Sequence, residues 1–306
     1  MITIDIIINI ILIFIFPFIY VGIINITKSL WSGRTPPHIL QSFFDFVKLI
    51  KKGVVISRTT SFVFSIAPTI IFASTIIAAF IVPLSGYNSF ISFNGDFIFF
   101  AYILCLARFF TIIMALDTGS AFSGMGASRE AIFGALIEPG FFIIVSNITS
   151  FTIDPTFKNV LSGMVFNSEY INLLVIILCG IGLFIMLIME GYRVPIDDPM
   201  THLELTMIHE AMVLDNSGFD LAIINYATSI KMVIFSGIIA NILLPFDITT
   251  IVYYIIFFLV IFILPIIIGT METFMARYKM RNVPQFLMLL TSVALVVLFC
   301  IQFVIL

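Results

Sequence analysis

The chain has 306 residues, of which 61% are hydrophobic and 10% are charged, and its formal net charge at pH 7 is −3. A soluble domain carries about 25% charged residues, so this chain cannot cover itself with polar side chains and must be embedded in lipid. The weak negative charge and the absence of a basic run give no indication of nucleic-acid binding.

Eight apolar segments are long enough to cross a bilayer, which takes about 20 residues. They are predicted at 2–26, 60–84, 97–116, 129–149, 171–190, 221–245, 251–275 and 284–306. The first segment contains Asp5, follows no basic residue and precedes no cleavage site, so it is predicted to be a retained helix. The sequence therefore predicts an all-α integral membrane protein in which residues 1–306 form a single polytopic domain.

The loop after the first span contains a short helical pattern at 42–53. Its apolar side chains fall on one face of a helix: Phe43, Phe46, Val47 and Ile50. Asp45 and the lysines lie largely elsewhere, which is typical of an amphipathic helix in the membrane interface.

The basic residues give the chain an orientation. Eleven of the 14 lysines and arginines fall in one set of loops: Lys28, Arg34, Lys48, Lys51, Lys52, Arg58, Arg129, Arg193, Arg277, Lys279 and Arg281. The opposite set contains only Lys158. Because cytoplasmic loops are enriched in basic residues, loops 27–59, 117–128, 191–220 and 276–283 are predicted to be cytoplasmic, with both termini outside a prokaryotic plasma membrane.

Three charged residues lie near the middle of predicted spans, where an ionised side chain costs about 2.5–3.5 kcal/mol. They are Arg108 in the third span, Glu138 in the fourth and Lys231 in the sixth. One acid and two bases at similar depth can pair inside the bundle. Two interpretations stay open: a static polar clasp between helices, or a proton-conducting element.

Further carboxylates lead from this depth toward the cytoplasmic loops. Glu130 is close to two helical turns from Glu138 and shares a broad face with it. Glu190 ends the fifth span, and Glu272 lies near the cytoplasmic end of the seventh. These acids are predicted to form a ladder along which protons can move.

The stretch 190–218 is the most acidic part of the chain. Its carboxylates are Glu190, Asp197, Asp198, Glu204, Glu210 and Asp215, against the single arginine Arg193. His202 and His209 lie seven residues apart, but no HExxH motif is present, so a metal site is disfavoured. No nucleophile motif indicates a hydrolase. A polar lining for proton uptake, or a docking surface for soluble partners, is favoured.

The three cysteines do not have the spacing of metal ligands. Cys105, Cys179 and Cys300 lie singly in apolar segments without a CxxC motif. Disulfides, zinc and iron–sulfur clusters held by this chain are therefore not predicted.

Several motifs resemble one membrane-protein family. EGYRVPIDDP at 190–199 resembles the glutamate–arginine–proline–aspartate–proline pattern of complex I subunit 1. Its continuation, THLELTMIHEAMVLDNSG, is more similar to the membrane subunits of energy-converting and formate-hydrogenlyase-type nickel–iron hydrogenases. The stretches GRTPPHILQSFFDFVKLIKKG, GSAFSGMGASREAIFGALIEP and MARYKMRNVPQ are similar to other loops of the same family, in the same order.

The resemblance implies a subunit that joins an electron-transfer arm to antiporter-like membrane subunits. The expected partners are hydrogenase small and large subunits and an iron–sulfur protein, which would carry the iron–sulfur clusters and the nickel–iron centre. No redox centre is expected on this chain. The resemblance assigns proton-path and coupling roles to Glu138, Glu190, Arg193, Asp197, Glu204, Glu210 and Asp215. The remaining candidates for this path are Asp198, Glu130, Arg108, Lys231 and Glu272.

The first cytoplasmic loop is expected to lie near the arm. The resemblance places Arg34, Asp45 and Lys48 on this docking surface, and Arg129, which opens the fourth span, is expected there too.

One departure separates two readings of the function. Quinone-reducing relatives usually carry a Glu-Tyr-Ser-Gly run, whereas this chain has Asp215, Asn216, Ser217 and Gly218. The leading hypothesis is thus the membrane anchor and coupling subunit of a hydrogenase-type complex, which moves protons or sodium. The alternatives are a quinone-chamber subunit of a NADH- or ferredoxin-linked dehydrogenase, a stand-alone transporter and a purely structural anchor.

Overall fold

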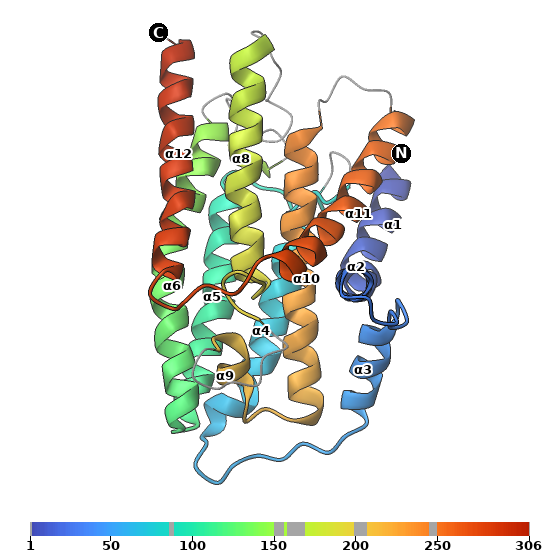
Figure 1. Ribbon diagram of the computed structural model, residues 1–306, viewed down its shortest axis with the longest axis vertical. Helices are drawn as coiled ribbons and strands as arrows, with labels where there is room; N and C mark the ends of the chain where they lie inside the picture. The colour runs from blue at the N-terminus through green and yellow to red at the C-terminus, as the bar shows by residue number, and fades with distance from the viewer. Residues whose placement is uncertain are drawn as a thin grey trace.

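The computed structural model describes residues 2–85, 89–149, 156–157, 169–198, 207–244 and 250–305. Within these ranges every regular element is helical (Figure 1). The predicted site residue Glu204, as well as His202, lies outside the described residues.

The helices follow the predicted order of apolar segments. They are α1 (Ile2–Phe14), α2 (Phe16–Trp31), α3 (Gln41–Ile50), α4 (Phe62–Ile81), α5 (Asp96–Asp117), α6 (Ala121–Thr149), α8 (Glu169–Glu190), α9 (His209–Val213), α10 (Gly218–Leu243), α11 (Thr250–Phe274) and α12 (Val283–Ile305). The segment predicted as an amphipathic helix is therefore helical, as α3.

Among the described residues, six helices are long and apolar enough to cross a membrane by themselves: α4, α5, α6, α10, α11 and α12. The pair α1 and α2 passes the same test together, but it is bent by 52° at Ile15. The apolar part of α8 that is described, Leu174–Glu190, is shorter. The fold is thus an all-helical, multi-pass membrane protein with six or seven candidate spans, against the eight that the sequence predicts.

The break between α1 and α2 has a local cause. Pro17 lies in the first turn of α2 and has no N–H to donate to α1, so the hydrogen-bond ladder is interrupted there. Hydropathy predicts one continuous helix over 2–26, because a single proline hardly changes the mean hydropathy of so long a segment.

Helix α6 begins at Ala121, whereas the sequence predicts its span to begin at residue 129. Most of the predicted loop 117–128 is therefore helical. The glycines of this segment favour a loop, but Gly126 packs closely against the stretch before α9: a Cβ there would lie 2.8 Å from the Ile208 carbonyl oxygen. Tertiary packing therefore outweighs the low helix propensity of glycine.

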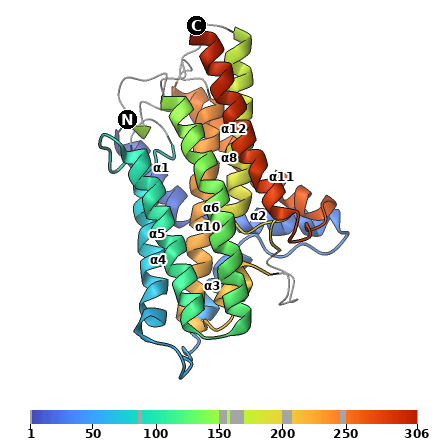
Figure 2. The ribbon, with the colours of Figure 1, turned by 90° about the vertical axis from the view of Figure 1, so that its left-hand side faces the viewer.

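Helix α10 runs through the centre of the bundle and is its most buried candidate span. It packs against α8, α4 and α2, while α12 packs on α6 and α8 (Figure 1). Helix α2 and part of the neighbouring α11 project sideways from the bundle (Figure 2). The short α3 packs against α2 and α10.

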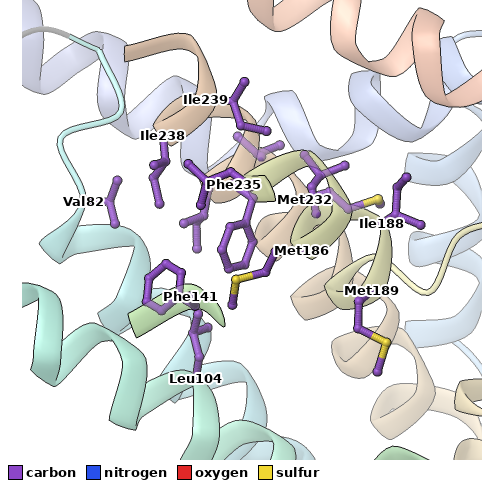
Figure 3. Close-up of a cluster of buried hydrophobic side chains, with 14 of the residues drawn as sticks. Val82, Leu104, Phe141, Met186, Ile188, Met189, Met232, Phe235, Ile238 and Ile239 are labelled. Carbon is purple, nitrogen blue, oxygen red and sulfur yellow. The ribbon is translucent and has the colours of Figure 1, made fainter. Parts of the chain in front are cut away.

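An apolar layer fills the middle of the bundle (Figure 3). Leu104 of α5, Phe141 of α6, Met186 of α8 and Phe235 of α10 are all buried in it. Each of these four residues lies about one helical turn from a charged residue on the same helix. The packing that forms the apolar layer therefore also brings four charged side chains together.

Candidate functional site: a charged cluster inside the bundle

Arg108 of α5 lies at the centre of a buried ion-pair network and is 5% exposed. Its Nε atom is 3.2 Å from Oε1 of Glu130, and its Nη1 and Nη2 atoms donate to Glu138 and Glu190. One guanidinium thus joins carboxylates from α6 and α8. Five N–H donors in a rigid plane let arginine serve several carboxylates at once.

Lys231 of α10 adds a second cation, with its Nζ atom 3.0 Å from Oε2 of Glu190. We call Arg108, Glu130, Glu138, Glu190 and Lys231 the charged cluster. Three carboxylates face two cations, so the fully ionised cluster carries one net negative charge. Burying unbalanced charge is costly, and a cluster of this composition is therefore suited to hold one proton.

The sequence of α6 explains how the arginine fits. Glu130, Gly134 and Glu138 recur at intervals of four residues and so line one face of the helix. A Cβ on Gly134 would lie 2.8 Å from Nη1 of Arg108. The glycine makes room for the guanidinium between the two carboxylates.

The members of the cluster differ in their access to the surroundings. Glu130 and Glu190 are buried, whereas the side chain of Glu138 is 35% exposed. A small cavity of about 40 Å³ lies beside Glu138 and Arg108, lined in part by Tyr102, Cys105 and Phe142. Glu138 is therefore the most exposed member of the charged cluster, and it lies on the side where α5 and α6 face outward.

Tyr192 connects the cluster to the loop after α8. Its hydroxyl donates to Oε1 of Glu130 at 3.2 Å, and its ring stacks on His209 with centroids 4.1 Å apart. Burial raises the pKa of Tyr192 well above its usual value. Burial, with the charge of Lys231 in addition, lowers the pKa of His209 to about 3. Both side chains are thus neutral at physiological pH.

A larger cavity of about 360 Å³ lies beside Tyr192. We call it the loop cavity. It is lined by residues of α2, α3, the turn after α8, α9 and α10. Its charged and imidazole-bearing lining residues are Lys28, Asp45, Arg193, His209 and Glu210, and its aromatic ones are Phe18, Phe46, Tyr192 and Tyr226.

A second ion-pair group ties the loop to α2 and α11. Glu272 of α11 accepts from Arg193 through Oε1 at 3.3 Å and from Lys28 through Oε2 at 3.3 Å. Lys28 also approaches Asp198 at 4.0 Å. Arg193 and Lys28 line the loop cavity, so this group forms part of its charged wall.

Asp197 organises the start of α9. Its Oδ2 atom accepts from the backbone N–H groups of Ile208 and His209, and its Oδ1 atom is 2.8 Å from Nη2 of Arg277. Burial raises the pKa of Asp197, while the N–H of His209 and the charge of Arg277 act against this shift. The aspartate thereby holds His209 in place against Tyr192.

The remaining predicted residues lie away from the cluster. Glu210 and Asp45 line the loop cavity. Asp215 accepts from the hydroxyl of Ser123 at 3.4 Å, and Nη1 of Arg129 donates to the Met207 carbonyl at 2.8 Å. Arg34 and Lys48 are exposed.

Pairing between Arg108 and Glu138 follows the prediction, but Lys231 pairs with Glu190 instead. The sequence placed Glu190 at a helix end and Arg108 at mid-span, so the two were not expected to meet. Tyr192 and His209 were not recognised as part of this site. Tyr192 lies between Glu190 and Arg193 in the quoted motif, and that position was the available signal.

From the sequence, the only role considered for His209 is that of a metal ligand, which is disfavoured there. Among the described residues, no group of three or more histidine, cysteine, aspartate and glutamate side chains is placed to hold a metal ion.

Comparison with known proteins gives three similarities. Residues 4–302 match the family described as NADH dehydrogenase. Hydrogenase-4 component C of Escherichia coli is 30% identical over 231 residues, which cover 74% of this chain and 71% of the relative. Formate hydrogenlyase subunit 4 of the same organism is 25% identical over 227 residues, covering 73% and 72%.

A solved structure has the same fold. A chain of the membrane-bound sulfane sulfur reductase, an archaeal respiratory membrane complex, superposes with a TM-score of 0.81. The match covers 97% of this chain and 98% of the other, at 18% sequence identity.

Proposed function

The chain belongs to the NADH dehydrogenase family, that of complex I subunit 1, and from this premise we propose that it anchors and couples a hydrogenase-type membrane complex. Its relatives named as a component of hydrogenase-4 and a subunit of formate hydrogenlyase support this assignment. In the proposal, electrons stay in a cytoplasmic arm, and this subunit links their transfer to the translocation of protons or sodium.

The charged cluster is the observation that carries the proposal. Three carboxylates and two cations lie among apolar helices, where a purely structural anchor gains little from them. Replacing a buried ion pair by apolar residues is often neutral or stabilising. A cluster with one excess negative charge is therefore better explained by proton binding than by anchoring.

The coupling step follows from the shared arginine. When Glu138 takes up a proton, its attraction to Arg108 weakens, and the guanidinium is left to Glu130 and Glu190. The electrostatic field felt by Glu190 and Lys231 then changes, although neither has lost its partner. Moving one charge through 100 mV corresponds to about 2.3 kcal/mol, which is within reach of such changes.

The loop after α8 would transmit events in the arm to this cluster. Arg193, Asp197, Asp198, Glu210 and Glu272 surround the loop cavity or tie its walls together. Asp215 and Glu204 extend the acidic stretch. In the proposed topology this loop is cytoplasmic, both termini lie outside, α8 provides an eighth span and α3 lies in the interface.

The arm is proposed to dock beside the first loop. Arg34 and Lys48 present exposed positive charge there, and Asp45 and Arg129 belong to the same face in the proposal. The nickel–iron centre and the iron–sulfur clusters would be carried by the partner subunits.

Identification of co-purifying subunits tests the partners. Gently solubilised membranes should yield, by mass spectrometry, a hydrogenase large subunit with paired CxxC motifs, a small subunit, an iron–sulfur protein and antiporter-like membrane subunits. Recovery of this chain alone, or with the subunits of a quinone-reducing dehydrogenase, would contradict the proposal.

The loop cavity supports a second candidate function. Its volume of about 360 Å³ lies in the range of small-molecule sites, and its aromatic and apolar lining suits a quinone ring. In that case the complex would reduce quinone, and its turnover would respond to quinone analogues. Turnover that is indifferent to quinone and its analogues favours the hydrogenase-type assignment.

A further inference from the structure

We propose that Tyr192 relays protons between the loop cavity and the charged cluster, and that His209 is the positioning residue beside it. The inference rests on the proposed function and assigns the point at which a proton reaches the buried carboxylates. Three independent observations carry it: the contacts of Tyr192, its backbone conformation and the surroundings of His209.

Tyr192 touches both compartments. It lines the loop cavity, and its hydroxyl donates to Glu130, which is itself bound to Arg108. Tyr226 lines the same cavity, but its hydroxyl donates to the Phe14 carbonyl at 2.9 Å and leads away from the cluster. Position and hydrogen bonding therefore distinguish Tyr192 from another tyrosine in the same cavity.

The backbone of Tyr192 is held in a rarely occupied conformation. Its φ angle is 51°, in the left-handed region that bulky side chains seldom adopt. Such conformations cluster at functional sites, where the surrounding fold imposes them. Here the backbone N–H of Arg193 donates to the Ile188 carbonyl at 3.0 Å and fixes the turn that directs the ring inward.

His209 shields one face of the tyrosine ring. Its Nδ1 and Nε2 atoms are buried, and neither has a hydrogen-bond partner among the described residues. Buried polar atoms are nearly always hydrogen-bonded. His209 lines the loop cavity, so a small opening of the ring stack would let its buried nitrogens bind the water that delivers the proton.

Glu130, the proton acceptor in this relay, is also suited to receive the proton. The Oε2 atom of Glu130 is buried and has no hydrogen-bond partner within the described part of the chain, while Oε1 accepts from Arg108 and Tyr192. In the relay, the phenolic O–H bond of Tyr192 breaks as its proton passes to the Glu130 carboxylate. The phenolic oxygen takes a proton from a hydronium in the cavity, so the tyrosine is neutral before and after.

The test compares two tyrosine variants of the whole complex in liposomes, with a pH-sensitive dye to follow proton movement and an assay of electron transfer. Tyr192→Phe keeps the ring and its stacking but removes the hydroxyl, and we expect at least a tenfold loss of proton translocation. Tyr278→Phe removes a hydroxyl from a residue that belongs neither to the lining of the loop cavity nor to the charged cluster, and it keeps the ring contact with Phe286, so it should translocate protons at the rate of the unmodified complex. Equal rates for both variants would overturn the relay.

A solvent isotope effect separates relay from structural support. If the phenol carries the proton, translocation by the unmodified complex slows in heavy water, and the residual activity of Tyr192→Phe shows a different isotope effect. Identical isotope effects in the two proteins would mean that Tyr192 carries no proton in the rate-limiting transfer, and the proposal would be wrong.

His209→Phe provides a second, independent variant, because it retains an aromatic stack while removing both nitrogens. We expect translocation to fall although the complex assembles; translocation at the unmodified rate would remove the imidazole from the relay.

Glu138→Gln distinguishes this inference from the function on which it rests. If Glu138→Gln stops translocation while Tyr192→Phe does not, the relay fails and the coupling function stands. If neither variant affects translocation, both fail.

Discussion

Arg108 determines more of the site than any other single residue, because it is bonded to carboxylates from two helices. Its guanidinium offsets charge that would otherwise be buried without compensation. Tyr192 and His209 matter in a different way, since they are neutral groups that join the cluster to the loop cavity. Charge balance and proton access are thus assigned to different residues.

Removal of Arg108 should destabilise the protein strongly. In Arg108→Leu, Glu130, Glu138 and Glu190 lose their shared partner, and breaking a buried ion pair costs about 3–5 kcal/mol. We expect a clear drop in the thermal unfolding midpoint of the purified complex. Arg58→Leu is the control, because Arg58 is exposed in a loop and should leave the midpoint nearly unchanged. Similar midpoints for the two variants would refute the central role of Arg108.

The stability of the protein should fall in mild acid because of His209. Its pKa is about 3 in the folded protein, against 6.5 when unperturbed, so the folded state binds fewer protons. Its contribution to stability is therefore present above pH 6.5 and is lost as the pH falls toward 3. Between pH 6.5 and 5 the loss should be about 2 kcal/mol, at roughly 1.4 kcal/mol per pH unit.

Unfolding midpoints measured across that range check this effect. The unmodified protein should lose stability more steeply than His209→Phe, which has no group to titrate there. Parallel profiles would show that His209 is not buried in a neutral form.

Among the helices, the apolar segments of the sequence predicted where most of them lie along the chain. They did not predict how far one helix is shifted along its axis relative to its neighbours. Hydropathy identified α4, α5 and α10 to within a few residues, because each is a predominantly apolar segment of sufficient length. The similar positions of Arg108 and Glu138, each near the middle of its predicted span, also predicted their pairing. Hydropathy could not predict that the end of α8 reaches the same depth, because helix tilt and offset depend on packing between distant segments.

The same reason explains the other departures. The early start of α6 depends on its contact with the stretch before α9, and that contact joins residues far apart in the sequence. The break at Ile15 could have been predicted from Pro17, because proline interrupts a helix locally.

The contact between α6 and α9 should be sensitive to a single methyl group. In Gly126→Ala, the new Cβ would lie 2.8 Å from the Ile208 carbonyl oxygen, and α9 would have to move. We expect greater hydrogen exchange of the backbone around His209 and weaker coupling. Gly124→Ala is the matched control, because no atom beyond the local helix lies within 4 Å of its Cβ. If the two variants exchange alike, α6 does not hold α9 in place.

For the whole molecule, the proposed orientation follows from the distribution of positive charge. In a variant without Cys105, Cys179 and Cys300, a single cysteine at exposed Lys51 should react with an impermeant maleimide only from the cytoplasmic side. A cysteine at exposed Asn94 should react only from outside. The reverse pattern would invert the proposed topology and place the loop cavity away from a cytoplasmic arm.

In the proposed function, electron delivery to the complex changes the protonation of buried carboxyl groups in this subunit. The most direct test is the infrared difference spectrum between the oxidised and reduced complex, recorded for the unmodified protein and for Glu138→Gln. We expect a carboxyl C=O band that changes on reduction and is lost or displaced in the variant. A spectrum without carboxyl bands, or one that the substitution leaves unaltered, would contradict it.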